Sequence, residues 1–216
     1  MNLTRANLFK ATLKEAEFNN ATLRDAILTE ASVESIILVN TDATDANFRL
    51  TNFTDATITH SILDGANLSG AQLDRATLNN VLAEKTDITG TDFTNAILVG
   101  SNFKEATGDN LTNFFSADLS GVNLEVGSFI GTNFANADFF TAGQSTANLD
   151  KADLTNANLT NVDATGITFI DGLAIGADVT NADFSNSTLI KSNFTDAIGI
   201  ATAIFDGADT TDAIGL

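Results

Sequence analysis

The chain has 216 residues and a formal net charge of −18, from 28 acidic and 10 basic side chains. It contains no cysteine, which excludes disulfides and thiolate metal sites. So acidic a surface repels nucleic acid, and we do not expect direct binding of DNA or RNA.

From Leu3 onward a large apolar residue recurs every five positions, as at Leu8, Leu13 and Phe18. We call this residue the centre of its pentad. The residue two positions earlier is usually small, and the residue between them is often Asn or Asp. In extended chain, residues two apart point to the same side, so we expect the small residue and the centre to face inward. The remaining two residues favour turns, so each pentad predicts a very short strand and a corner.

The pentads run in one frame as far as Glu105, where the unit 106–111 has six residues and shifts the frame by one. The clearest repeats follow at 147–161. The unbroken pattern predicts a single domain over 1–216, with a small bulge at the six-residue unit. No apolar run is long enough to span a membrane, and no signal peptide is visible, so we expect a cytoplasmic protein.

The centres predict a columnar core, in which the phenylalanines stack along the axis. Gln144 is a polar centre and is expected to hydrogen-bond the backbone or a buried water. Ala164 is a small centre, and Val162 before it is expected to conserve the interior volume. The core residues that we single out are Phe129, Phe134, Phe139, Leu149, Leu154 and Leu159.

The sequence offers no constellation for catalysis. His60 is the single histidine and falls at an outward corner position. The glycines are dispersed corner residues, unlike a loop that cradles phosphate between a strand and a helix. We therefore predict no catalytic, cofactor or metal site, and no enzyme.

The motif Ala-Asp/Asn-Leu recurs at 6–8, 66–68, 117–119 and 152–154. In this motif the chain resembles the pentapeptide-repeat proteins, and the resemblance covers essentially the whole sequence. It implies a right-handed, four-sided β-helix with four pentads per coil, hence about ten coils and a rod roughly 50 Å long at the usual strand spacing. It also implies a non-enzymatic scaffold or interaction protein of the type common in cyanobacteria, with a protein partner that the sequence does not identify.

The alternative function is mimicry of DNA, because relatives that protect DNA gyrase are acidic rods. The acidity is concentrated after residue 105, where 106–216 contain only Lys151 and Lys191 as basic residues. With four pentads per coil, Asp118, Asp138 and Asp178 are expected in one column, interrupted by Asn158. Against mimicry, gyrase-protecting relatives carry projecting loops, whereas the only clear internal insertion in this pattern is one residue.

Two sets of outward apolar residues predict contact surfaces. With four pentads per coil, Ile130, Ile170 and Ile190 should share one face, with Asp150 between them. At the C-terminal end the pattern decays, because Gly199 and Asp209 stand where apolar centres are due. In the same five-residue frame, Phe205 falls on an outward position. Related proteins often dimerise through this end, so we expect a two-fold dimer through an apolar surface that includes Phe205, Ile214 and Leu216.

Overall fold

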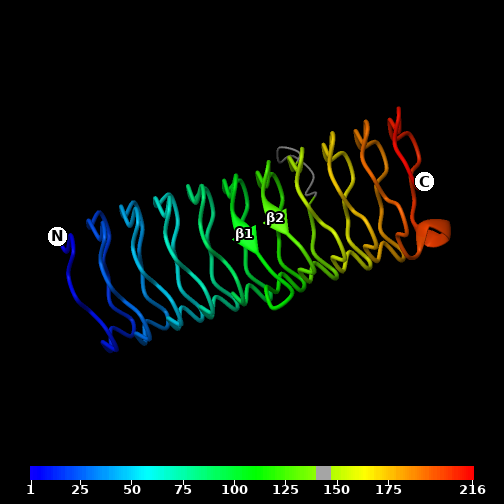
Figure 1. Ribbon diagram of the computed structural model, residues 1–216. Coiled ribbons are helices and arrows are strands. Elements are labelled where there is room, and N and C mark those ends of the chain that lie inside the picture. The colour runs from blue at the N-terminus through cyan, green and yellow to red at the C-terminus, as the bar shows by residue number, and fades with distance from the viewer. Residues whose placement is uncertain (140–146) are drawn as a thin grey trace.

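The structure is a computed structural model that describes residues 1–139 and 147–216. The chain winds into a straight rod of stacked coils, with the two termini at opposite ends (Figure 1). Among the described residues, the elements longer than a single residue are β1 (Thr107–Gly108), β2 (Ser128–Phe129) and the 3₁₀ helix η1 (Ile200–Thr202). Elsewhere in the described ranges the coils are joined by isolated parallel bridges, and those ranges contain no α-helix.

Bridged residues in the first five coils are twenty positions apart, as in Asn2 with Thr22. The Leu3 N–H donates to the Thr22 carbonyl at 2.7 Å, and the Thr22 N–H donates to the Met1 carbonyl at 2.9 Å. Twenty residues per coil are four pentads, so the rod is the right-handed quadrilateral β-helix that the resemblance implies. We number its faces 1 to 4 by the columns of bridged residues that begin at Asn2, Asn7, Thr12 and Glu17, respectively.

Most of the described corners are tight turns with the same backbone geometry. At the first one the Ala6 N–H donates to the Leu3 carbonyl at 2.9 Å, and Arg5 between them has a φ of 59°. A positive φ at this point is typical of type II turns and is adopted most readily by Gly, Asn and Asp. The pentad places such residues here repeatedly, which explains why the chain turns in the same direction at successive regular corners.

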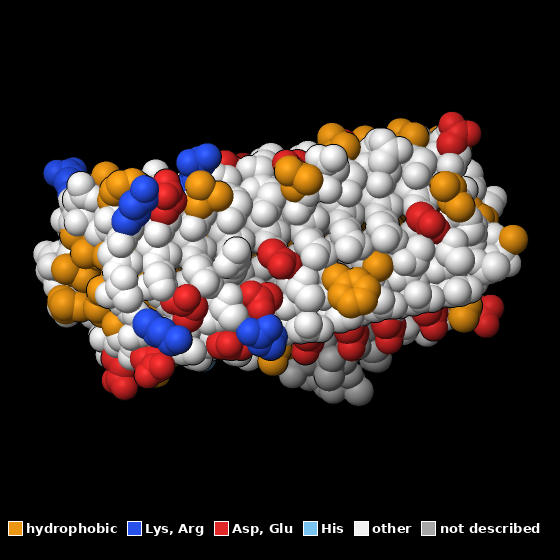
Figure 2. Space-filling model, turned by 90° about the horizontal axis from the view of Figure 1, so that it is seen from below, with side chains coloured by type: hydrophobic (Ala, Val, Ile, Leu, Met, Phe, Trp, Pro, Cys, Tyr) orange, Lys and Arg blue, Asp and Glu red, His pale blue; other side chains and the backbone are white. Residues whose placement is uncertain are grey.

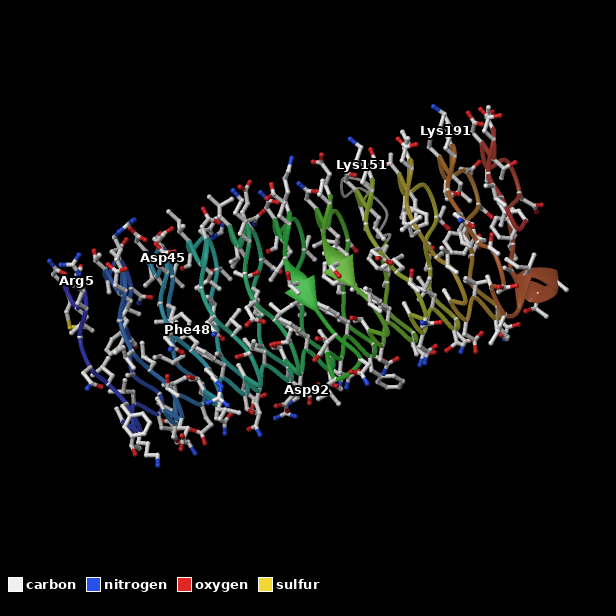
Figure 3. All side chains as sticks on the ribbon, viewed as in Figure 1. Arg5, Asp45, Phe48, Asp92, Lys151 and Lys191 are labelled. Carbon is white, nitrogen blue, oxygen red and sulfur yellow. The ribbon has the colours of Figure 1, made fainter. Side chains whose placement is uncertain are left out.

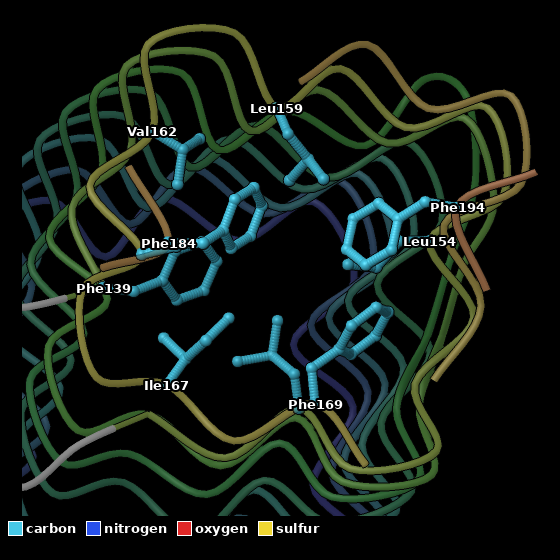
Figure 4. Close-up of a pocket in the computed structure, with 10 residues that line it drawn as sticks. Phe139, Leu154, Leu159, Val162, Ile167, Phe169, Phe184 and Phe194 are labelled. Carbon is cyan, nitrogen blue, oxygen red and sulfur yellow. The ribbon is translucent and has the colours of Figure 1, made fainter. Parts of the chain in front are cut away.

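The centres fill the interior, as expected. Phe93, Phe114 and Phe134 form a stack whose ring centroids are 4.6 and 5.0 Å apart. The six core residues singled out from the sequence are all at most 2 % exposed. A narrow gap remains in this core, and Figure 4 shows the apolar side chains around it pointing inward from successive sides of the coil. Both Val162 and Ala164 line this gap, so Val162 does not fully replace the volume that Ala164 lacks.

Three insertions change the register along the rod. At 106–111 the spacing between bridged residues rises from 20 to 21, as in the bridge of Asp92 with Asn113. This confirms the one-residue shift. Farther on, four successive bridges join residues 25 apart, including Asn123 with Asn148. Five residues beyond the regular repeat therefore lie between Phe139 and Ala147, and Gln144 falls outside the described residues. The third insertion is one residue at η1, because Asp183 bridges Ile204 after Asp178 has bridged Ile198.

Candidate interaction surface

Face 4 carries an uninterrupted column of carboxylates in the C-terminal half of the rod. Asp118 bridges Asp138, Asp138 bridges Asp163, and Asp163 bridges Asp183. We call these four residues the aspartate column. Coils succeed one another at about 4.8 Å, so four negative charges follow each other at that spacing.

The predicted position of Asp178 in this column is wrong. Asp178 bridges Asn158 and Ile198 and lies on face 3. The five additional residues before Ala147 advance every later pentad by one face, so Asp163 and Asp183 take the positions expected for Asn158 and Asp178. The sequence carries no signal for this change, because an insertion of five residues keeps the five-residue period intact.

Local hydrogen bonds hold the carboxylates of the aspartate column against their strands. The Ser120, Thr165 and Ser185 N–H groups donate to the Oδ1 atoms of Asp118, Asp163 and Asp183 at 3.0, 3.0 and 2.8 Å, respectively. In each case the aspartate bonds the backbone two residues on, which is an Asx turn. The side chains are half-buried and face outward from the bridge position. Asp118, Asp163 and Asp183 are therefore each held by a bond to the first corner residue of their own pentad.

No basic residue interrupts this surface. The pentads of face 4 contain no Lys or Arg anywhere in the sequence, and those of face 3 contain none after Arg75. Lys151 and Lys191 are the only basic residues after Lys104, and both lie along the edge of the rod opposite to Asp92 (Figure 3). A row of acidic side chains along one edge of the C-terminal half is visible in Figure 2. The aspartate column is thus separated from the two lysines of this half, which lie with Asp171 at another corner.

The three isoleucines expected on one face are divided between two. Ile170 and Ile190 succeed each other, because the Asp171 N–H bonds the Ile190 carbonyl at 3.0 Å and the Lys151 N–H bonds the Ile170 carbonyl at 2.9 Å. Ile130 lies on the next face, where the Gly131 N–H bonds the Thr155 carbonyl at 2.8 Å. The same five-residue insertion separates them, and they form no common apolar patch.

Phe205 is an inward residue and not the outward one expected from the sequence. Its ring stacks on Phe184 with a centroid distance of 5.4 Å and an interplanar angle of 7°. The extra residue at η1 moves the frame, so Phe205 becomes the centre of the pentad that begins at Ala203. In the last coil, exposed apolar side chains stand at Ile198, Ile204, Ile214 and Leu216.

The described ranges hold neither a metal-binding cluster nor a membrane-spanning helix. Residues 1–139 and 147–216 contain no group of three or more His, Cys, Asp or Glu arranged to hold a metal ion. The same residues contain no helix with the length and apolar character that a membrane span requires. His60 is exposed at a corner between faces 4 and 1.

Comparison with solved structures finds pentapeptide-repeat rods. Full-length QnrB1, a plasmid-mediated fluoroquinolone resistance protein, matches over 96 % of this chain and 90 % of its own, with 14 % identity and a TM-score of 0.59, which shows a shared fold. HetL, a pentapeptide repeat protein involved in heterocyst differentiation regulation from Nostoc sp. strain PCC 7120, is 26 % identical over 97 % of this chain and 89 % of its own, with a TM-score of 0.40. No curated protein sequence matched.

A family model described as pentapeptide repeats matches the chain in eight copies. The copies cover residues 2–38, 38–70, 51–90, 71–107, 86–125, 112–140, 145–171 and 174–198. Proteins built from this repeat are generally structural or interaction proteins. The chain belongs to the pentapeptide-repeat family.

Proposed function

We propose that this protein is a non-enzymatic binding rod, and that the C-terminal half of face 4 contacts a basic surface on a protein partner. The observation that supports the proposal is the aspartate column, in which four carboxylates succeed one another on a face whose pentads contain no Lys or Arg. A preordered row of one charge sign attracts a complementary surface and sets the orientation of docking.

The second candidate is mimicry of DNA toward a type II topoisomerase. B-DNA presents one charge per about 1.7 Å of axis. Residues 106–216 contain 14 acidic and 2 basic side chains, a net charge of −12. Over roughly half of a rod about 50 Å long, that is one net charge per about 2 Å. The shared fold with QnrB1, a fluoroquinolone resistance protein, favours testing this candidate.

The insertions bear on the same candidate. The sequence pattern argued against mimicry because only one internal insertion was visible. The register now requires five additional residues between Phe139 and Ala147, at the corner between faces 4 and 1. The chain therefore contains more than the one internal insertion that the five-residue pattern revealed.

The experiment compares two sets of four substitutions. Asp118, Asp138, Asp163 and Asp183 are changed to Asn in the test variant. The control variant changes four aspartates on faces 2 and 3, each of which also accepts a bond from the residue two positions on: Asp87, Asp92, Asp153 and Asp178. Asn fills the same position at Asn47 and Asn52, so both variants should fold.

The unmodified rod and both variants serve as parallel baits in a pull-down, and each is added to a DNA gyrase supercoiling assay. A partner retained by the control variant and lost by the test variant supports the proposal. Loss of that partner from both variants, or from neither, contradicts the assignment to face 4. Inhibition of supercoiling by the unmodified rod supports mimicry, and its absence at high protein concentration rejects mimicry alone.

A further inference from the structure

We propose that the 216-residue chain associates head to tail, with the C-terminal coil of one molecule stacked on the N-terminal coil of a second copy. This inference does not depend on the proposed function. It concerns residues 1–20 and 197–216, which lie at opposite ends of the rod (Figure 1).

The backbone groups at the two ends are complementary. Inside the rod, the N–H of each bridged residue donates to the carbonyl of the small residue in the preceding coil. The Ile27 N–H, for example, donates to the Ala6 carbonyl at 2.9 Å. The carbonyl of the bridged residue accepts from the N–H of the pentad centre below it, as the Ile27 carbonyl does from the Leu8 N–H at 2.7 Å. In the first coil, the N–H and carbonyl groups of Asn7, Thr12 and Glu17 have no such partner among the described residues.

The last coil offers what the first coil lacks. The carbonyls of Ala203 and Ala208 and the N–H groups of Phe205 and Thr210 have no backbone partner among the described residues. Continuing the helix into a second molecule places its residues 6–10 over 203–207 and its residues 11–15 over 208–212. Every intermolecular contact then repeats the pairing found between successive coils, and two unpaired strand edges are removed.

The interiors of the two ends also fit. Leu3, Leu8, Leu13 and Phe18 pack against the core but remain partly exposed, because no coil covers them. In the last coil only Phe205 is a large centre, since Thr210 and Gly215 take the following two centre positions. The large centres of the N-terminal coil therefore face small centres of the C-terminal coil, and stacking buries apolar area on both ends.

Charge selects this arrangement over a two-fold contact. Residues 1–20 contain Arg5, Lys10 and Lys14 against Glu15 and Glu17, a net side-chain charge of +1. Within the rod, Arg5 and Lys10 also form exposed ion pairs with Asp25 and Glu30 of the second coil, at 3.6 and 3.2 Å. Residues 197–216 contain three acidic side chains, at Asp206, Asp209 and Asp212, and no basic one, a net side-chain charge of −3. The two-fold dimer expected from the family resemblance would oppose two surfaces of −3. The head-to-tail stack opposes +1 and −3, and it brings Lys10 to the corner that carries Asp206.

The assembly is open-ended, because each added molecule presents a new free end. Sedimentation velocity should therefore show dimers, trimers and longer species as the protein concentration rises, and added salt should shorten the series. Small-angle scattering should show lengths that grow by roughly 50 Å per molecule.

The decisive test is complementation between two variants. Lys10→Asp and Asp206→Lys each place like charges across the contact, so each alone should bind its own copies at least about tenfold more weakly. An equimolar mixture of the two variants should recover association, because each then finds an oppositely charged end. Lys151→Asp and Asp171→Lys, at exposed corners within the rod, are the matched controls and should associate like the unmodified chain.

Three results would overturn the inference. The first is a closed dimer that does not grow with concentration and is unaffected by Lys10→Asp, which indicates a two-fold contact through the C-terminal coils. The second is a monomer at every concentration and salt. The third is association that both variants retain, or that mixing fails to restore, since the contact would then not join residues 1–20 to 197–216.

Discussion

Asp138 pairs through its strand with Asp163, twenty-five residues farther along the chain. The Phe139 N–H donates to the Asp163 carbonyl at 2.9 Å, and the Asp163 N–H donates to the Ala137 carbonyl at 3.3 Å. This one register determines which carboxylates share a face in the C-terminal half. It aligns Asp163 and Asp183 with Asp118 and Asp138, and it places Asp178 elsewhere.

The aspartate column should reduce the stability of the rod. Unit charges about 4.8 Å apart repel by roughly 1 kcal/mol per pair in water, and less in salt. Changing Asp118, Asp138, Asp163 and Asp183 to Asn should therefore raise the free energy of unfolding by about 1 kcal/mol or more at low ionic strength. Urea denaturation at low and high salt measures this. A gain that does not shrink in salt, or an equal gain for the control set on faces 2 and 3, would contradict the repulsion.

The alternation of inward and outward residues is tested at two adjacent positions. Leu154 is 2 % exposed, whereas Thr155 lies at the corner that follows it. Leu154→Asp buries a carboxylate without a partner and should unfold the rod or melt the coils around it. Thr155→Asp should change the free energy of unfolding by only a few tenths of a kcal/mol. Circular dichroism during thermal unfolding compares them, and similar losses from both would refute the assignment.

The gap beside Ala164 can be filled. Ala164 is a centre with a small side chain, and it lines the gap together with Val162 and Phe184. Ala164→Val adds two methyl groups where space exists, so it should stabilise the rod by about 1 kcal/mol. Ala174→Val is the control, because Ala174 is fully buried and does not line the gap. That control should be neutral or destabilising, and a larger gain from it than from Ala164→Val would show that the gap is not the cause.

Asp109 supports the six-residue corner and should make stability depend on pH. Burial opposes its charged form, but bonds from the N–H groups of Gly90, Leu111 and Thr112 and from the Thr112 hydroxyl outweigh this effect and lower the pKa of Asp109 below its ordinary value of 3.8. A carboxyl whose pKa is lower in the folded state contributes stability above its unfolded pKa. That contribution is lost as the pH falls through the folded pKa.

Asp109→Asn should therefore be less stable than the unmodified rod by about 1 kcal/mol at pH 7, since bonds to a charged group are stronger than bonds to an amide. The difference should disappear below the folded pKa of Asp109. Denaturant titrations across acidic pH would measure the convergence. A constant difference at every pH would show that the Asp109 charge is not responsible.

The sequence by itself determined the pentad, the direction in which each residue points and the composition of the core. These properties are local: a small residue, an Asx and an apolar centre have the same orientations in every coil. Blocks such as Ala152-Asp153-Leu154 therefore predicted a coiled chain of short strands and corners, whereas its four sides were implied by the family resemblance. The burial of Leu154 follows from its place in the block. The shift at 106–111 was also predictable, because one extra residue breaks the five-residue period.

The tertiary structure alone decided which residues share a face. That property depends on the number of residues in every preceding corner, so it accumulates along the chain. Five added residues before Ala147 leave the period unchanged, yet they rotate all later pentads by one face and separate Ile130 from Ile170. At η1 the single extra residue resembled decay of the pattern, and only the bridge from Asp183 to Ile204 and the stacking of Phe205 on Phe184 showed that the coil continues. The physical reason is that inward and outward are set within one strand, whereas register is set by hydrogen bonds between strands twenty or more residues apart.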